Sequence, residues 1–501
     1  MSGHSFGQEI NPALFNPKLV RQGEALAAQY CGGCHLQPRA DLLDRQTWHG
    51  EAMPSMFYVL GMDPNGHQPG KEGRLIRQSG GVLNSPLMSP EQFAAIGAYY
   101  VSNAPPRIPG PTIKAPIPLS TQFRKLRFIG HSKTPNVSMT RFTDDGKNLF
   151  AGIMIGSQLR KMDLQGKRFR TLGLDVKPVA ITEQPAGLWV TSIGDFLPTE
   201  DKNGNVMFLK RTDEGYVFPQ NVLTNLHRPV DTQLADLNAD GREDLIVSQF
   251  GWYTGKLSWF EKRAKGGYEE HVILPMPGAL KSEIHDFNGD GRPDVAALFA
   301  QSWETMCIFL NNGRGQFEMK TLFQKQPAFG HGYFQFYDHD SDGDLDLLTA
   351  NGDNGDYHSP VKPYHGVRIY RNDGNLKFTE IAFMAMPGVM RALPIDFEGD
   401  GDFDVAAISY YPEYRKDRRA GFMLFTNDGQ DRFTATTIAE ADAGRWITMD
   451  TADIDGDGDQ DLALGSLIPG PAADFYIPPD LMSQWNNRQR PILLIENLHR
   501  N

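Results

Sequence analysis

Five residues near the start of the chain, Cys31-Gly32-Gly33-Cys34-His35, carry the clearest chemical signal in the sequence. Two thiols at this spacing can add across the vinyl groups of a porphyrin, and the adjacent imidazole can bind its iron. A redox dithiol would be expected beside a βαβ pattern, and a structural zinc site would need two more Cys or His at short spacing. The remaining cysteine, Cys307, lies far away in an apolar segment. The motif therefore predicts one covalently attached haem c, held by Cys31, Cys34 and His35.

Two predicted helices flank this motif. Residues 23–30 predict a helix that runs into the cysteines, with Leu26 and Tyr30 on one face. A second helix is predicted to start at Ser89, which can cap it, with Pro90 in its first turn. Two helices around a Cys-x-x-Cys-His loop resemble a small class I cytochrome c domain. The resemblance implies an all-α, cytochrome c-like haem domain over residues 1–110 and a role in electron transfer.

The resemblance also implies a second axial ligand of the iron, which is usually a methionine between the two helices. Residues 48–56 look like the "W…LPxM" segment of haem domains that are joined to repeat propellers, which favours Met56. Histidine in its place would give bis-histidine ligation and a lower reduction potential. The alternatives to Met56 are Met53, Met62, His49 and His67. Met88 directly precedes the helix cap and is expected to pack in the core.

Length, composition and net charge limit the classes of protein to which the chain can belong. Its 501 residues are enough for several domains, and 40% hydrophobic and 11% aromatic content is typical of a folded protein. We find no apolar run near ~18 residues, so no transmembrane segment is expected. Residues 1–110 contain eight Lys and Arg and eight Asp and Glu, so the net charge of −12 lies downstream. Nucleic acid is therefore not an expected partner.

The first residues lack the basic and then apolar layout of a signal peptide. Covalent haem c is normally attached outside the cytoplasmic membrane, so we expect a periplasmic or extracellular protein whose leader has been removed or replaced. Prolines are concentrated between Pro105 and Pro118. We expect residues 111–121 to form a semi-rigid linker after the haem domain.

Five segments downstream share the pattern D-x-[N/D/E]-x-D-G-x-x-D followed by an apolar residue. Side-chain oxygens at positions 1, 3, 5 and 9, a backbone carbonyl at position 7 and Gly at position 6 match the ligand set that Ca²⁺ prefers. The predicted side-chain ligands are Asp236, Asn238, Asp240 and Asp244; Asp286, Asn288, Asp290 and Asp294; Asp338, Asp340, Asp342 and Asp346; Asp396, Glu398, Asp400 and Asp404; and Asp453, Asp455, Asp457 and Asp461.

The pattern resembles the FG-GAP/VCBS repeat, whose loops bind Ca²⁺ between the first two strands of a β-propeller blade. The absence of Glu at position 12 and the strands on both sides argue against an EF-hand. The resemblance implies up to five calcium ions, and Glu398, one methylene longer than Asp, makes the fourth loop doubtful. Such loops can also be hydrogen-bonded Asx-turns without metal.

A recurring apolar strand gives the number of blades. It occurs seven times, at residues 159–162, 206–209, 257–260, 307–310, 367–370, 422–425 and 492–495. An outer strand follows each of the first six, and residues 122–129 are expected to supply the seventh by pairing with the last blade. The predicted fold is mainly β, with a seven-bladed propeller over residues 122–501 and a small all-α domain before it.

Long loops between the second and third strands are expected at one end of the propeller, opposite the calcium loops, and function tends to concentrate in such loops. Basic and aromatic residues expected there would suit an anionic or carbohydrate-like ligand, although ordinary rim residues explain them as well. The weak candidates for catalysis are His227, Arg228, His331, His365, Arg391 and Arg445. A motif of quinone-binding propellers, at residues 254–259, occurs once and does not repeat, so that cofactor is not expected.

The leading hypothesis is an exported mono-haem c-type cytochrome in which the calcium-binding propeller binds a partner or substrate. The expected partner is a redox protein or a small-molecule electron donor or acceptor. A binding or adhesion module with a structural or sensory haem is one alternative. A haem-coupled dehydrogenase with its site at the propeller mouth is another, although we find no nucleophile, flavin motif or catalytic metal cluster to support it. The oligomeric state stays open.

Overall fold

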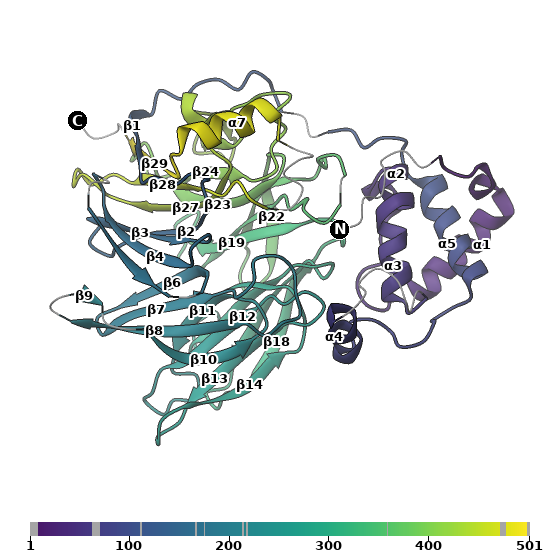
Figure 1. Cartoon of the computed structure of the whole chain (residues 1–501), viewed down its shortest axis with the longest axis horizontal. Coiled ribbons are helices and arrows are strands. Elements are labelled where there is room, and N and C mark those ends of the chain that lie inside the picture. Colours follow the sequence, from purple (N-terminus) through teal and green to yellow (C-terminus); the bar gives the residue numbers. More distant parts are fainter. Residues whose placement is uncertain are drawn as a thin grey trace.

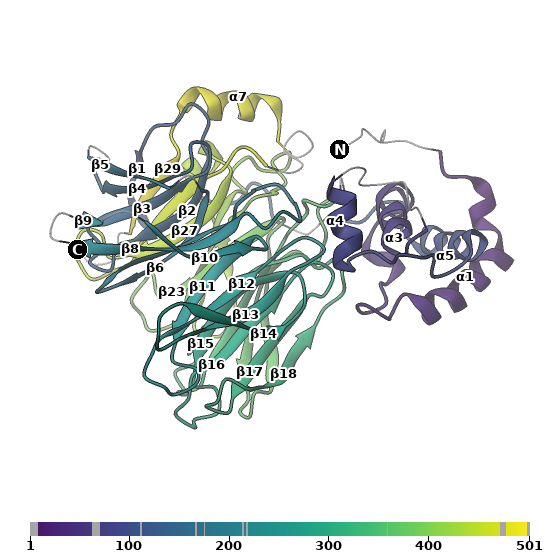
Figure 2. The same cartoon turned by 60° about the horizontal axis from the view of Figure 1, so that its bottom comes forward.

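The computed structural model describes residues 9–62, 71–110, 113–165, 168–174, 176–212, 215–216, 219–357, 359–470 and 477–497. A helical domain at the N-terminal end lies beside a larger domain built of strands (Figures 1 and 2). None of the helices in the described ranges has both the length and the apolar character needed to cross a membrane.

In its described residues, the helical domain has five helices and three short turns. The helices are α1 (Pro17–Tyr30), α2 (Arg45–Thr47), α3 (Met53–Val59), α4 (Lys71–Ser79) and α5 (Pro90–Asn103), with 3₁₀ turns at Pro12–Phe15 and Ala40–Leu42 and a π turn at Trp48–Ala52. α1 begins earlier than the expected residue 23 because the Asn16 side chain accepts hydrogen bonds from the first backbone N–H groups. α5 begins after Ser89 as predicted, with a capping box between Ser89 and Gln92.

α1 and α5 cross at Gly23. A Cβ atom there would lie 1.8 Å from the carbonyl oxygen of Ala95, so the backbones approach as closely as they do because position 23 has no side chain. Trp48 stacks on Tyr100 with ring centroids 4.3 Å apart beneath this crossing. The apolar core of the domain therefore joins α5 to the π turn that precedes α3.

The described strands form seven antiparallel sheets, which confirms the seven-bladed propeller (Figure 1). The first three blades contain β2 (Val137–Phe142), β3 (Asn148–Ile153), β4 (Gln158–Asp163) and β5 (Phe169–Gly173); β6 (Pro178–Gln184), β7 (Gly187–Ser192), β8 (Gly204–Thr212), β9 (Gly215–Tyr216) and β10 (Gln220–Leu226); and β11 (Pro229–Ala235), β12 (Asp244–Gln249), β13 (Lys256–Lys262) and β14 (Tyr268–Leu274). The fourth and fifth contain β15 (Ala279–His285), β16 (Asp294–Phe299), β17 (Thr305–Asn311) and β18 (Phe317–Gln324); and β19 (His331–Tyr337), β20 (Asp346–Asn351), β21 (Gly366–Asn372) and β22 (Phe378–Ala385). The last two contain β23 (Val389–Ile395), β24 (Asp404–Ser409), β25 (Phe422–Thr426) and β26 (Thr434–Thr436); and β27 (Trp446–Ala452), β28 (Asp461–Ser466), β29 (Ile492–Asn497) and β1 (Phe123–Ile129).

The ring is closed by β1, which pairs antiparallel with β29 from the other end of the chain. This pairing confirms the expectation that residues 122–129 complete the last blade. A 3₁₀ turn (Ala439–Ala443) precedes β27, and helix α7 (Pro479–Arg488) lies between β28 and β29 at the top of Figure 1. Closure therefore joins the two ends of the propeller sequence in one blade, where β1 covers the outer edge of β29.

The stretch before β1 packs against the sixth blade. Ile117 is buried in the core of that blade, and its backbone N–H donates to the Asp417 carboxylate at 2.8 Å. The N–H of Thr437 donates to the carbonyl of Pro118, and the N–H of Ser120 donates back to Thr437. The described part of the expected linker is therefore fixed to the propeller along most of its length.

The first strand of every blade contains the same irregularity. Its pairing with the second strand skips one residue directly after the first pair, as between Ala279 and Lys281 and between Val389 and Arg391. Such a bulge bends the strand and changes the direction of the following side chains. The bulge therefore sets the direction of the Lys281 and Arg391 side chains, which belong to the third residues of β15 and β23.

Candidate functional site

The Cys-x-x-Cys-His motif directly follows α1. The N–H of Cys31 donates to the carbonyl of Ala27 at 2.8 Å, so Cys31 ends the helix. Burial raises the pKa of the Cys31 thiol, whereas Cys34 is exposed on the loop. The two sulfurs are free thiols rather than a disulfide. One thiol thus faces the domain core and the other faces outward.

His35 has one ring nitrogen in a hydrogen bond. Its Nδ1 lies 2.8 Å from the carbonyl oxygen of Leu36, which leaves Nε2 for a ligand. Metal-bound histidines usually donate their second ring N–H to a carbonyl or carboxylate in this way. Cys31 contacts an apolar cluster that includes Met53, Met62 and Tyr100. A thiol pair, an imidazole with a fixed tautomer and an adjacent apolar surface are a donor set that fits haem c.

The candidates for the second axial ligand are distributed over α3 and its neighbours. Met56 lies on α3 and is partly buried, but it is not a member of the cluster that contains Cys31. Met53 is buried in that cluster and Met62 packs against it, while His49 lies in the π turn. His67 lies outside the described residues. The choice of Met56 stays a prediction. Met88 is buried, as expected.

The five predicted calcium loops each join the first and second strands of a blade, as in β19 to β20. In each loop the position-1 carboxylate accepts backbone N–H bonds from the turn, including that of the Gly at position 6. The position-9 carboxylate accepts from the N–H of position 2 and from the end of the third strand; for Asp346 these donors are His339 at 2.8 Å and Asn372 at 2.7 Å. The same two bonds recur at the other four position-9 residues.

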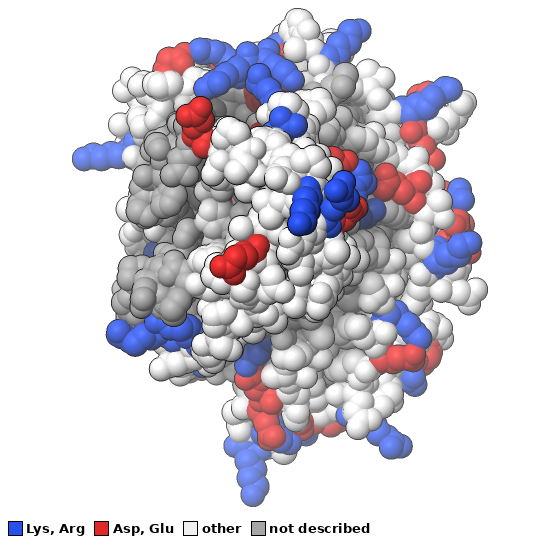
Figure 3. All heavy atoms as spheres, turned by 90° about the vertical axis from the view of Figure 1, so that its right-hand side faces the viewer, with Lys and Arg blue, Asp and Glu red and all other residues white. Residues whose placement is uncertain are grey.

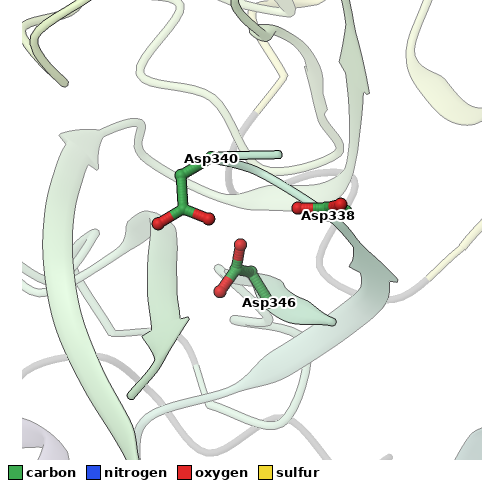
Figure 4. A group of neighbouring side chains, drawn as sticks. All are labelled: Asp338, Asp340 and Asp346. Carbon is green, nitrogen blue, oxygen red and sulfur yellow. The ribbon is translucent and has the colours of Figure 1, made fainter. Parts of the chain in front are cut away.

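Two of the loops bring three carboxylates together. Asp338, Asp340 and Asp346 offer oxygens within 4.8 Å of one another, and so do Asp453, Asp455 and Asp461. The carboxylates of the first group face a common point (Figure 4). Burial and neighbouring carboxylates raise the pKa of Asp461 to about 7 and raise that of Asp346 as well. Converging anions whose ionisation is opposed in this way form a site that suits a hard divalent cation.

The other three loops differ in detail. In the first two, the arginine at position 7 (Arg242 or Arg292) pairs with the position-5 carboxylate and also donates to a carbonyl at the end of the third strand. In the fourth loop Glu398 contacts Asp404, and burial together with this contact raises the pKa of Asp404 to about 9. The extra methylene of Glu398 therefore lets its carboxyl group reach position 9, and occupancy of the fourth loop stays open.

Four of the six basic candidates at the propeller mouth are buried and have structural partners. Arg228 donates to the carbonyls of Gly251 and Phe196, and Arg445 donates to those of Tyr410 and Ile468. Each arginine thereby joins the long loops of two neighbouring blades. His331 is hydrogen-bonded to the buried Glu304 carboxylate at 2.7 Å. Burial lowers the pKa of His365, whose Nδ1 accepts from the N–H of Gly388.

His227 and Arg391 are the two candidates that keep accessible surface. His227 is hydrogen-bonded to Thr254, and burial with nearby Lys202 and Lys256 lowers its pKa to about 4. The Arg391 guanidinium lies over the ring of Tyr333, 4.9 Å from its centroid. Arg391 is on β23 and His227 precedes β11, so these two come from different blades.

The helical domain is docked on the long-loop end of the propeller, with α3 and α4 nearest to it (Figures 1 and 2). The hydrogen bonds that cross the boundary include two of 3.1 Å, from the Arg39 N–H to Gln326 Oε1 and from the Tyr364 hydroxyl to the carbonyl of Leu42. Another joins the Tyr357 hydroxyl and the Ser55 side chain. The apolar contacts come from Trp252 and Tyr253 of the third blade and from Ala328 and Tyr357 near the fifth, which pack on two clusters of the helical domain. All of these propeller residues lie in long loops or in connections between blades.

These docking residues were not among the candidates from the sequence. The only signal for Tyr357 and Tyr364 was their place in an unusually long loop between β20 and β21. Glu304, which is hydrogen-bonded to His331, lies in a shorter loop, and no pattern in the sequence marked it as a candidate.

Comparison with known proteins supports the propeller. Residues 286–349, 338–407 and 396–464 match the FG-GAP-like repeat, and these ranges contain four of the five loops described above. No curated protein matches the chain.

Two solved structures are similar to this chain at low sequence identity. A candidate 6-phosphogluconolactonase from Bacteroides fragilis has 12% identity and a TM-score of 0.43, with 63% of this chain and 87% of that chain covered. A streptogramin B lyase has 12% identity and a TM-score of 0.46, with 75% of this chain and 98% of that chain covered. At this distance neither similarity carries an argument about activity.

Proposed function

We propose that the chain is a mono-haem c-type cytochrome fused to an FG-GAP-like propeller, and that it acts in electron transfer outside the cytoplasmic membrane. The observation that carries the proposal is the motif Cys31 to His35 at the end of α1, with His35 Nδ1 hydrogen-bonded to Leu36 and Nε2 left for a ligand. Bound haem would supply one-electron oxidation and reduction.

The residues of the helical domain have distinct roles in this proposal. Cys31 and Cys34 would hold the porphyrin by thioether bonds and His35 would bind the iron. Met56 is the proposed second axial ligand, with Met53, Met62, His49 and His67 as the alternatives. The apolar cluster around Trp48 and Tyr100 would exclude water from the inner side of the bound haem.

The propeller would be stabilised by calcium and would bind the partner, either a redox protein or a small-molecule electron donor or acceptor. Up to five ions are proposed, and the loops at Asp338 and Asp453 have the strongest support because three carboxylates converge in each. Figure 3 looks onto the side of the molecule where the helical domain lies, and charged side chains are sparse over the middle of this face. Electrostatic attraction would therefore contribute little to partner docking on this side.

A haem-coupled oxidoreductase with its substrate at the propeller mouth is the second candidate. The observation in its favour is that the helical domain contacts the long-loop end of the propeller, where His227 and Arg391 keep accessible surface. A binding module with a structural or sensory haem is the remaining alternative, and it differs in that no electron exchange with a partner is expected.

The proposal is tested by producing the full chain in a host that attaches haem c in its periplasm. We expect covalent haem that remains on the denatured polypeptide and a reversible one-electron reduction. Replacement of both Cys31 and Cys34 by Ala should abolish attachment, whereas Cys307→Ala should retain it. A polypeptide without covalent haem contradicts the proposal. A haem that exchanges electrons with none of the candidate partners would instead favour the sensory or structural alternative.

A further inference from the structure

The propeller contacts the segment that follows His35. Arg39 and Leu42 of this segment are hydrogen-bonded to the propeller. The Arg39 N–H donates to Gln326 Oε1, and the Leu42 carbonyl accepts from the Tyr364 hydroxyl, both at 3.1 Å. The segment directly after the imidazole is thus held at two points by side chains of the propeller.

A second propeller residue reaches the segment that carries Met56. Tyr357 packs against the apolar cluster that contains Cys31 and Met53, although it belongs to the fifth blade. Its hydroxyl is hydrogen-bonded to the side chain of Ser55, the residue next to Met56. The α3 segment is therefore held from the propeller side as well.

Described residues of the loop that carries both tyrosines are held by contacts of their own. The Tyr364 ring stacks on Phe329 at 5.3 Å with an interplanar angle of 6°. Asn354 and Ser359 exchange two hydrogen bonds, from Asn354 Nδ2 to the Ser359 carbonyl and from the Ser359 hydroxyl to Asn354 Oδ1. A loop fixed in this way can transmit a positional constraint instead of absorbing it.

We propose that Tyr357 is a positioning residue for the second axial ligand of the haem iron, and that the loop between β20 and β21 sets the reduction potential from the propeller. The proposal rests on the proposed function, because it presumes a haem on Cys31 and Cys34. It goes beyond that function by assigning to the fifth blade the regulation of the redox centre. Anything that displaces this loop, such as a partner bound at the propeller mouth, would change the potential through Tyr357 and Ser55.

The test uses the full haem-loaded chain and compares Tyr357→Phe, Ser55→Ala and the double variant with the unmodified protein. Thioether ligation raises the potential, so looser positioning of α3 is expected to lower the midpoint potential and to weaken the red-edge absorption band of methionine-ligated ferric haem. The double variant is expected to show the same change as either single variant, because both remove one hydrogen bond.

The matched control is Tyr414→Phe. Tyr414 is buried and packs in a separate cluster with Trp485, and its hydroxyl has no hydrogen-bond partner among the described residues. We expect it to leave the potential unchanged. A haem-loaded Tyr357→Phe protein with the original potential and spectrum overturns this inference alone. Wild-type protein without covalent haem overturns the proposed function together with it.

Discussion

The carbonyl oxygen of Ala95 on α5 lies 1.8 Å from the position that a Cβ of Gly23 on α1 would take. No side chain fits at position 23 without separating the two helices. Since Cys31 ends α1 and Tyr100 lies on α5, this crossing also determines how the Cys-x-x-Cys-His loop meets the apolar core.

Gly23→Ala is expected to destabilise the helical domain, by about 1–3 kcal/mol or more, because one methyl group must be accommodated between two backbones. The yield of attached haem should fall with it. Gly50→Ala is the control in the same domain, since an added Cβ there meets no atom within 4 Å. Urea unfolding, monitored by helix content and by haem absorbance, measures both effects. Equal behaviour of the two variants would show that the close approach is not a constraint.

Asp340→Ala tests the calcium site directly. Asp340 belongs to a converging carboxylate group but accepts none of the backbone hydrogen bonds that shape its loop. In excess Ca²⁺ the variant should lose about 1–3 kcal/mol of stability, which is the range expected for one site near saturation. With a chelator the variant should be as stable as the unmodified protein, or slightly more stable, because one repelling charge is gone.

Thermal unfolding with and without Ca²⁺ measures this difference. Asp144→Ala, in the 1–2 turn of the first blade where the pattern is absent, is the control and should not respond to Ca²⁺. The same loss in both conditions would favour a hydrogen-bonded turn without metal.

His227 should make the propeller less stable in mild acid. Its pKa falls from the ordinary 6.5 to about 4 in the folded protein, so the unfolded chain binds a proton that the folded chain does not. This contribution to stability is complete above about pH 6.5 and is lost as the pH falls towards 4. His227→Gln should reduce the difference in unfolding free energy between neutral and mildly acidic solution. Replacement of the exposed His131 by Gln should leave that difference unchanged. If His227→Gln had the same pH profile as the unmodified protein, His227 would not be the cause of the loss of stability in mild acid.

A count of thiols distinguishes attached haem from free cysteines. The chain has three cysteines, and burial raises the pKa of the Cys307 thiol to about 11. Native haem-loaded protein should therefore not react with a thiol reagent at neutral pH, and the denatured protein should release one thiol. Three reactive thiols in the denatured protein, together with reaction of the exposed Cys34 in the native protein, would mean that no thioether bonds have formed.

Much of the fold follows from local sequence patterns. The number of blades was predictable because each blade repeats the same short strands, five of the seven also repeat the Asp-rich turn, and each unit is specified within about fifty residues. The start of α5 was predictable for the same reason, since Ser89 and Pro90 act on the backbone next to them. Pairing of β1 with β29 was predictable because the seventh blade had no outer strand of its own.

For the candidate site, the sequence identified some residues and left others undecided. The motif at Cys31 is recognisable from sequence alone because all of its donors lie within five residues. The second axial ligand was not, because several methionines occupy similar local surroundings. The basic residues at the mouth were grouped by type, and only the tertiary structure separated Arg228 and Arg445, which bind loop carbonyls in the interior, from Arg391, which keeps accessible surface.

By itself, the sequence identified the Cys31 to His35 motif and determined the seven-bladed ring, because both depend on residues close together in the chain. The tertiary structure alone decided which blade contacts the helical domain. Arg39 and Gln326 are 287 positions apart, and Leu42 and Tyr364 are 322 apart. A contact at that separation depends on the shapes of two finished surfaces, and no local pattern of residues encodes it.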